Sequence, residues 1–172
     1  MKTNIVYRNA ELSDSLNLSV LFKQVFIQTY ATEGINTESS IYITKEFSVE
    51  KIKNTIENYP GNIIVALNGN NLVGVAEIDF EKECPVNNEL IPELSKLYVL
   101  ECFMKKGIGY RLLTEVEKAV RTKGKNKLWL SVNIMNTRAI TFYERQQYKR
   151  IGNLFFQMEF NSYENHVMLK KL

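Results

Sequence analysis

The chain has 172 residues, of which 45% are hydrophobic and 24% charged, and its formal net charge at pH 7 is +3. No Pro/Gly/Ser-rich linker or shift of composition divides it, so we expect one compact domain over residues 1–172 with a sizeable core. No apolar run approaches the roughly 20 residues of a membrane span, and the first residues lack the apolar stretch of a signal peptide. We therefore expect a cytoplasmic protein with no membrane association.

The cysteines and the single histidine argue against several kinds of site. Cys84 and Cys102 have neither redox nor metal-ligand spacing. His166 alone cannot supply a histidine-rich metal site or an evident nucleophile triad. We therefore expect no bound metal, and two free cysteines that are both buried.

The first half of the chain predicts strands and helices in alternation. Residues 5–8 suit a strand, and Ser13 suits the cap of a following helix. The apolar residues that recur at helical spacing in this helix are Leu16, Val20, Leu21, Val25 and Phe26. Ser48 suits the cap of a second helix that ends before Pro60. Residues 62–67 and 72–80, joined by an Asn-Gly-Asn-Asn turn, predict a β-hairpin.

The second half continues the alternation. Residues 93–100 predict a strand, and the helix after it carries apolar residues largely on one face. These residues are Ile108, Leu112, Leu113, Val116, Ala119 and Val120. A strand over 127–132 precedes a helix from the cap residue Asn136 through Gln146. Residues 149–160 and 164–171 predict a closing antiparallel pair around Asn161 and Ser162, which makes the fold a mixed α/β sandwich.

Gly107-Ile108-Gly109 is the most informative feature, because it lies between an apolar strand segment at 97–100 and an amphipathic run at 110–122. Glycines let a backbone approach an anion closely, and a new helix directs its positive end toward the ligand. A phosphate-bearing cofactor is the first hypothesis. A tight turn that merely starts a helix is the alternative.

A second motif agrees with the first. The apolar strand at 128–132 leads into Asn136-Thr137-Arg138-Ala139-Ile140-Thr141-Phe142-Tyr143. With residues 97–109, this order resembles the GNAT superfamily of acetyl-CoA-dependent N-acetyltransferases. In that family a [Gln/Arg]-x-x-Gly-x-[Gly/Ala] loop between strand and helix holds the pyrophosphate, and an Asn-x-x-Ala-x-x-x-Tyr helix follows a later strand.

The resemblance covers nearly the whole chain and is closest to bacterial PaiA-type spermidine/spermine acetyltransferases. It implies a mixed, mostly antiparallel central sheet flanked by helices and splayed near the acetyl-CoA site. The cofactor-binding residues that it implies are Leu97, Tyr98, Val99, Met104, Lys105, Lys106, Gly107, Ile108, Gly109, Tyr110 and Asn136. Asn136 has a second interpretation as a helix cap whose side-chain oxygen accepts from a backbone N–H.

The chain departs from the family pattern at four positions, two of which are adjacent. Met104 stands where the family has Gln or Arg and offers no side-chain donor, so backbone amides must carry more of the phosphate binding. Ser95 stands where a glutamate often lies, which leaves the general base open. Gln147-Tyr148 replaces the usual Gly-Phe after the tyrosine helix, which leaves open how that helix ends.

The chemistry requires a base and an acid. An alkyl ammonium with a pKa near ~10 must lose a proton before it attacks a thioester. Glu93 is the leading candidate for the base, and a surface acid at a strand start is its alternative. By resemblance, a backbone N–H of residues 97–99 stabilises the oxyanion, and the Tyr143 hydroxyl protonates the leaving thiolate. Tyr143 could instead simply pack beside Phe142.

Charge differs between segments. Residues 96–127 contain nine Lys or Arg against three acids, whereas residues 77–93 contain six acids against Lys82 alone. The basic segment surrounds the glycine loop and would attract a polyanionic cofactor. The acidic segment would attract a cationic amine if it lines the acceptor entrance; scattered surface acids on a solvated loop are the alternative. No aromatic stacking motif accompanies the basic residues, so we expect no nucleic-acid partner.

The sequence therefore predicts an enzyme that moves an acetyl group from acetyl-CoA to a small primary amine, preferably a polyamine such as spermidine or spermine. Two alternatives remain open. A protein or peptide N-acetyltransferase would use the same cofactor site with an open acceptor groove. A non-catalytic acyl-CoA-binding regulatory protein is favoured only by the atypical Met104 and Ser95. The expected partner is a small-molecule amine, and a homodimer is left open.

Overall fold

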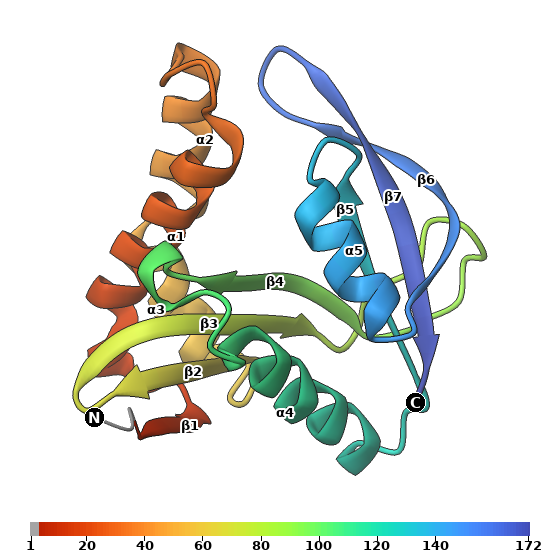
Figure 1. The fold of residues 1–172 in the computed structure, drawn as a ribbon, viewed down its shortest axis with the longest axis horizontal. Helices are drawn as coiled ribbons and strands as arrows, with labels where there is room; N and C mark the ends of the chain where they lie inside the picture. Colours follow the sequence, from red (N-terminus) through yellow and green to blue (C-terminus); the bar gives the residue numbers. More distant parts are fainter. Residues whose placement is uncertain (1–3) are drawn as a thin grey trace. The chain divides into compact units, whose positions relative to one another are not determined.

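The computed structural model describes residues 4–172 and has a mixed α/β fold (Figure 1). Its helices and strands follow in chain order. They are β1 Ile5–Asn9, α1 Ser15–Tyr30, α2 Thr37–Glu46, α3 Val49–Asn58, β2 Ile63–Asn68, β3 Asn71–Asp79, β4 Glu93–Val99, α4 Ile108–Thr122, β5 Lys127–Asn133, α5 Thr137–Arg145, β6 Lys149–Gln157 and β7 Ser162–Lys171.

The seven strands form one open sheet in the order β1-β2-β3-β4-β5-β7-β6. β4 and β5 pair in parallel, whereas β1/β2, β2/β3, β5/β7 and β6/β7 pair antiparallel. The prediction of a mixed, mostly antiparallel sheet with helices is confirmed. The splay beside the acetyl-CoA site stays a prediction.

The chain divides into two compact units. The first consists of the residues up to Glu77 and of Lys96–Val116, and the second of Ile78–Ser95 and Glu117–Leu172. β3, β4 and α4 each contribute residues to both units.

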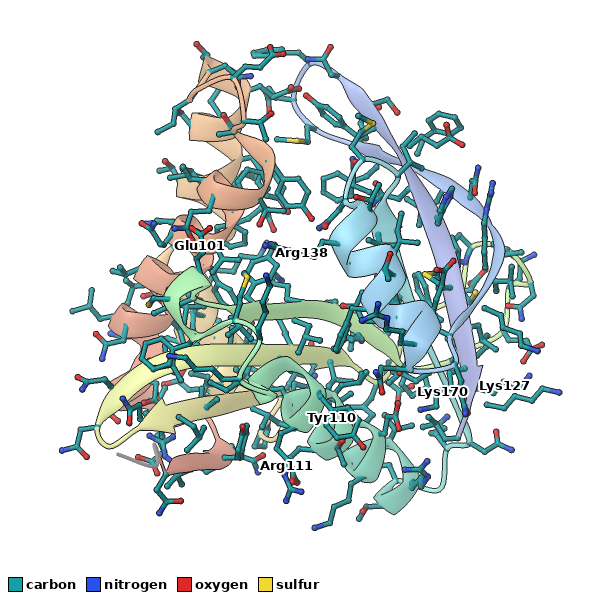
Figure 2. All side chains as sticks on the ribbon, in the orientation of Figure 1. Glu101, Tyr110, Arg111, Lys127, Arg138 and Lys170 are labelled. Carbon is teal, nitrogen blue, oxygen red and sulfur yellow. The ribbon has the colours of Figure 1, made fainter. Side chains whose placement is uncertain are left out.

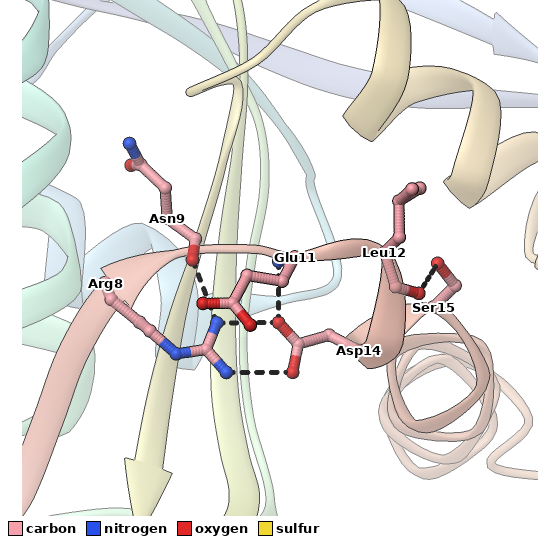
Figure 3. A network of polar contacts seen from close by, with 6 residues as sticks. All are labelled: Arg8, Asn9, Glu11, Leu12, Asp14 and Ser15. Carbon is pink, nitrogen blue, oxygen red and sulfur yellow. Dashed lines mark hydrogen bonds and ion pairs between the residues drawn. The ribbon is translucent and has the colours of Figure 1, made fainter.

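In the first unit, an ion pair between Arg8 and Asp14 lies immediately before α1 (Figure 3). Arg8 donates two hydrogen bonds to Asp14, at 2.7 and 3.0 Å, and the Glu11 N–H donates a third at 2.8 Å. The Arg8 guanidinium therefore holds the pKa of the Asp14 carboxyl below its usual range. Residues Leu12–Asp14 form a 3₁₀ turn, and α1 begins at Ser15, so the prediction that Ser13 caps the helix is wrong.

The phase of α1 also differs from the prediction. Leu16 and Val20 are 64% and 61% exposed, although the apolar spacing assigned them to the core. Leu18 and Phe22 are buried instead, with Leu21, Val25 and Phe26 as expected. The helix is apolar on more than one face, so periodicity alone did not decide which face packs.

α2 was not predicted from the sequence. Asn36 caps it by accepting a hydrogen bond from the Ser39 N–H at 2.8 Å. Ile43 is its one buried apolar side chain, which leaves little apolar periodicity to recognise. The next helix, α3, was predicted correctly, and its cap Ser48 accepts from the Lys51 N–H.

The β2/β3 hairpin was predicted correctly and contains a bulge. Its register passes from Ala66 opposite Gly74 to Leu67 opposite Leu72, which leaves Val73 as the extra residue. The Val73 carbonyl accepts a hydrogen bond from the Leu100 N–H at 3.0 Å. This bond ties β3 to Leu100, the residue that follows β4 and precedes the 3₁₀ turn at Glu101–Phe103.

Gly74 lets β3 approach α4 closely. A Cβ built on Gly74 would lie 3.1 Å from both the Leu112 Cδ1 and the Tyr98 carbonyl oxygen. Any larger side chain would push α4 or β4 away. Gly74 therefore helps to fix the start of α4, where the predicted phosphate loop lies.

Gly74→Ala should lower the free energy of unfolding by about 1–3 kcal/mol, because an added methyl overpacks this contact. Urea denaturation measures the loss. Leu112→Val removes the methyl group nearest the new Cβ, so the double variant should lose less than the sum of the two single variants. Strictly additive losses would show that this contact is not the cause.

In the second unit, the core forms around Trp129, which packs with Cys84, Ile91 and Val167. Its indole N–H donates to the Ile91 carbonyl at 2.9 Å and so anchors the loop before β4. Cys102, in the first unit, is exposed, so the prediction that both cysteines are buried is wrong for Cys102. β7 begins at Ser162, two residues before the predicted strand.

Candidate active site

The predicted phosphate loop follows a 3₁₀ turn at Glu101–Phe103 in the first unit. Lys105 and Gly107 adopt left-handed backbone angles, with φ of 60° and 80°. Left-handed backbone is energetically unfavourable for a non-glycine residue such as Lys105. Residues strained in this way are common at binding sites. Alternating backbone of this kind turns neighbouring N–H groups toward one point, which suits an anion.

α4 begins directly after this loop. The Arg111 N–H donates to the Gly107 carbonyl at 3.0 Å, which is the first bond of the helix. The N–H groups of Ile108, Gly109 and Tyr110 precede any intrahelical acceptor, and they lie at the positive end of the helix dipole. The loop therefore offers backbone donors for an anionic group, as the replacement of the family's Gln or Arg by Met104 requires.

The side chains of the loop divide by exposure. Lys105, Lys106, Gly107 and Tyr110 are exposed, and the Lys106 ammonium lies 4.7 Å from the centre of the Phe103 ring. Met104 and Gly109 are half-buried. The Ile108 side chain is buried, so only its backbone can contact a ligand. These cationic side chains and backbone donors fit a pyrophosphate group.

The first turn of α4 also carries Arg111, which Figure 2 labels beside Tyr110. Its guanidinium pairs with Glu115 at 3.0 Å and lies 6.0 Å from the centre of the Tyr7 ring. Arg111 is therefore engaged within the first unit, and Lys105 and Lys106 are the cations of the loop itself.

β4 places its side chains on alternating faces. The Lys96 ammonium lies 5.6 Å from the centre of the Phe22 ring, and the Tyr98 ring meets the same ring in a T-shaped arrangement with the centres 5.9 Å apart. Lys96 also pairs with Glu77 at 3.0 Å. Leu97 and Val99 therefore face the opposite side of the strand. The oxyanion role of the backbone at 97–99 stays a prediction.

Glu93 and Asn136 belong to the second unit. Glu93 is the half-buried first residue of β4 and lies opposite Trp129 in the parallel register. The Asn136 side-chain oxygen accepts from the Ala139 N–H at 3.1 Å, so Asn136 does cap α5. Contact of Asn136 with a cofactor stays a prediction, as does the base role of Glu93.

Tyr143 is buried in the second unit, with 8% of its surface exposed. Its ring centre lies 5.2 Å from that of Phe142 and 5.7 Å from that of Tyr148. The packing that was the alternative explanation of Tyr143 is therefore present. The catalytic role of the Tyr143 hydroxyl stays a prediction.

The structure shows how α5 ends at Gln147-Tyr148, where the family usually has Gly-Phe. The Tyr148 N–H donates to the Tyr143 carbonyl at 3.0 Å, and the Gln147 N–H donates to the Glu144 carbonyl at 2.9 Å. These are the two bonds of a Schellman motif. Gln147 has a φ of 69° at the position that usually favours glycine. The helix ends as it would with glycine, at an energetic cost.

Gln147→Gly should therefore raise the free energy of unfolding, by up to about 1–2 kcal/mol, because glycine adopts this backbone without the steric penalty of a Cβ. The gain is partly offset by the greater freedom of glycine in the unfolded chain. Thermal unfolding followed by circular dichroism measures the shift in melting temperature. Lys149→Gly, two residues later in β6, is the control and should destabilise.

A polar cluster at Tyr148, whose ring contacts Tyr143, was not predicted from the sequence. Glu117 accepts hydrogen bonds from the Tyr148 hydroxyl at 3.2 Å and from the Lys170 ammonium at 2.7 Å. Figure 2 shows Lys170 on β7. Burial, and then the nearby Glu117 carboxylate, raise the pKa of Tyr148 well above its usual range, so its hydroxyl remains a donor. The one signal for this cluster in the sequence was Tyr148 in place of the family's Phe.

Within residues 4–172, no group of three or more His, Cys, Asp or Glu side chains lies close enough together to hold a metal ion. In the same part of the chain, no helix has both the length and the apolar character that a membrane crossing requires.

Known proteins of similar sequence are acetyltransferases. Spermidine N(1)-acetyltransferase of Thermoplasma acidophilum is 28% identical over 152 residues, which cover 85% of this chain and 89% of the relative. An uncharacterized N-acetyltransferase of Mycobacterium tuberculosis is 32% identical over 80 residues, which cover 46% of this chain and 51% of the relative.

Solved structures show the same fold. The PaiA N-acetyltransferase from Thermoplasma acidophilum, in complex with coenzyme A, matches with a TM-score of 0.77 and 24% identity over 98% of this chain and 99% of that one. A GCN5-related N-acetyltransferase from Rhodopseudomonas palustris matches with a TM-score of 0.79 and 16% identity over 100% and 99%. Residues 29–148 match the family model described as Acetyltransferase (GNAT) family, and the chain therefore belongs to this family of acetyltransferases.

Proposed function

We propose that this chain transfers an acetyl group from acetyl-CoA to a small primary amine, and that polyamines such as spermidine and spermine are its preferred acceptors. The observation that carries the proposal is the loop at 104–109, with its left-handed backbone and its helix N-terminus. Membership of the acetyltransferase family supports the reaction class. The spermidine acetyltransferase relative supports the acceptor class.

The loop at 104–109 would hold the pyrophosphate of the cosubstrate. Backbone N–H groups of residues 108–110 donate to the phosphate oxygens, and Lys105 and Lys106 add positive charge. Leu97, Tyr98 and Val99 would border the pantetheine, with a backbone N–H that stabilises the oxyanion. Acetyl-CoA supplies an activated thioester, and no metal is needed for its transfer to an amine. We propose that both units act as one acetyltransferase domain over 1–172.

Two side chains would move protons. Glu93 accepts a proton from the alkyl ammonium, directly or through water, so that the amine has a lone pair for attack. Tyr143 donates its phenolic proton toward the departing sulfur, because a phenol remains protonated at neutral pH.

The acidic segment at 77–93 would favour a cationic acceptor, although some of its charge is neutralised within the chain. Glu77 pairs with Lys96 in the first unit, and Glu89 pairs with Lys127 in the second. Glu81 and Glu83 are exposed on the loop that follows β3. These two carboxylates are the strongest candidates for the attraction of a polyamine.

The test is a screen for thiol release from acetyl-CoA with polyamines, amino acids, aminoglycosides and peptides. Turnover with spermidine or spermine above the other classes is expected. Faster turnover with a peptide would show that peptides, and not polyamines, are the preferred acceptors. Binding of acetyl-CoA without turnover on any class would favour a regulatory protein.

Neutralisation of the acidic loop should weaken a polyamine selectively. The triple variant Glu81→Gln, Glu83→Gln, Glu89→Gln should raise the spermidine KM about 10-fold at low salt, with a smaller effect at high salt, since each exposed charge contributes roughly 0.2–1 kcal/mol. The acetyl-CoA KM should change little.

The control places the same kind of charge change elsewhere. Glu50 and Glu57 are exposed acids on α3 in the first unit, and Glu50→Gln with Glu57→Gln should leave the spermidine KM unchanged. An unchanged spermidine KM in the triple variant would remove the acidic loop from the proposal and leave the transferase assignment intact.

A further inference from the structure

We propose that Tyr148 is a positioning residue for Tyr143, held in place by a buried hydrogen-bond cluster with Glu117 and Lys170. The inference rests on the proposed function, since it assigns a purpose to the surroundings of the proposed acid. All four residues belong to the second unit.

Tyr148 holds Tyr143 in two ways. Its backbone N–H donates to the Tyr143 carbonyl at 3.0 Å, which fixes the last turn of α5. Its ring meets the Tyr143 ring in a T-shaped arrangement, with the centres 5.7 Å apart and the planes at 63°. The ring contact joins the two residues that the Schellman motif brings together, so backbone and side chain restrain Tyr143 jointly.

The Tyr148 ring is in turn held by its hydroxyl. It is 2% exposed, and the hydroxyl donates to the Glu117 carboxylate at 3.2 Å. A ring that only filled space would need no hydroxyl here, and phenylalanine would suffice. The hydroxyl therefore restricts the ring to one position against Tyr143.

Glu117 is itself fixed from two elements. Lys170 on β7 donates to its Oε1 atom at 2.7 Å, and Arg121, one turn further along α4, lies 3.9 Å from Oε2. The Lys170 ammonium also lies 5.5 Å from the centre of the Tyr148 ring. The buried carboxylate thus has its charge compensated, and it links α4 and β7 to the end of α5.

The consequence for catalysis follows from geometry. Protonation of a leaving sulfur requires the phenol to lie within hydrogen-bond reach, and small displacements of a reacting group reduce rates steeply. A Tyr143 ring that is free to shift would donate its proton less often. Tyr148 and Glu117 would therefore affect the chemical step without contact with either substrate.

The experiment is a double-mutant cycle measured by single-turnover acetyl transfer to the best amine of the screen. Tyr148→Phe keeps the ring and deletes the hydroxyl, and it should slow the chemical step about 10-fold with unchanged affinity for acetyl-CoA. In a Tyr143→Phe background, the same change should have no further effect, because the group that it positions is gone.

Tyr7→Phe is the matched control, since it deletes the hydroxyl of another partly buried tyrosine, in β1 of the first unit. It should leave the rate unchanged. Thermal unfolding of each variant separates loss of stability from loss of rate.

The outcomes separate the two proposals. A wild-type rate in Tyr148→Phe, with a large loss in Tyr143→Phe, overturns the positioning role and keeps the acid. Equal losses from Tyr148→Phe in both backgrounds also overturn it, because the effect would not pass through the Tyr143 hydroxyl. A wild-type rate in Tyr143→Phe overturns the acid and the positioning role together.

Discussion

Tyr143→Phe should reduce the single-turnover rate of acetyl transfer by about 100-fold or more, which is the usual contribution of a general acid. The substitution keeps the ring contacts with Phe142 and Tyr148 and removes only the hydroxyl. Stability and acetyl-CoA affinity should therefore change little, and the loss should appear in the chemical step.

Single-turnover measurement is essential because slow product release can hide a damaged chemical step. Phe142→Leu is a useful comparison, since it disturbs the same ring cluster and leaves the Tyr143 hydroxyl in place. It should lower the melting temperature more than Tyr143→Phe and the rate much less. A folded Tyr143→Phe protein with a wild-type rate would show that Tyr143 is a packing residue.

Features encoded within a few neighbouring residues were predictable from the sequence. The hairpin of β2 and β3, the Ser48 and Asn136 caps and the start of α4 each depend on local turn and cap chemistry. The glycine loop was predictable for the same reason, since its strand and helix adjoin it in the chain.

Features that depend on distant partners were not predictable. The buried face of α1 depends on aromatic neighbours from α2 and β4. Glu117 meets Tyr148 across 31 positions and Lys170 across 53 positions. No local periodicity encodes such pairs, so the cluster of Glu117, Tyr148 and Lys170 could be identified only from the structure.

The departure from the family pattern at Gln147-Tyr148 has structural consequences at the end of α5. Gln147 adopts the left-handed backbone that glycine would take, and Tyr148 adds a hydroxyl that phenylalanine lacks. The first change costs stability, and the second adds a buried hydrogen bond in the same turn. The end of α5 is thus strained at Gln147 and held by a side-chain hydrogen bond at Tyr148, and the proposed positioning of Tyr143 is argued from this arrangement.

Gly107→Val should weaken acetyl-CoA binding at least 10-fold, or roughly 1.4 kcal/mol, as measured by calorimetry. Gly107 has a φ of 80°, and a built Cβ meets nothing within 4 Å. The effect would therefore come from the backbone, because a β-branched residue avoids left-handed angles and would turn the loop N–H groups away from the phosphates. The same strain should cost about 1–2 kcal/mol of stability.

Gly69 supplies a matched control in the same unit. It lies in the β2/β3 turn with a φ of 60°, and a Cβ there also meets nothing within 4 Å. Gly69→Val should therefore lose similar stability and keep its affinity for acetyl-CoA. Gly107→Asn completes the comparison, because asparagine tolerates left-handed angles and should recover much of the lost stability. If Gly107→Val binds acetyl-CoA as tightly as Gly69→Val does, the loop at 104–109 does not hold the phosphates, and the proposed cofactor site must lie elsewhere.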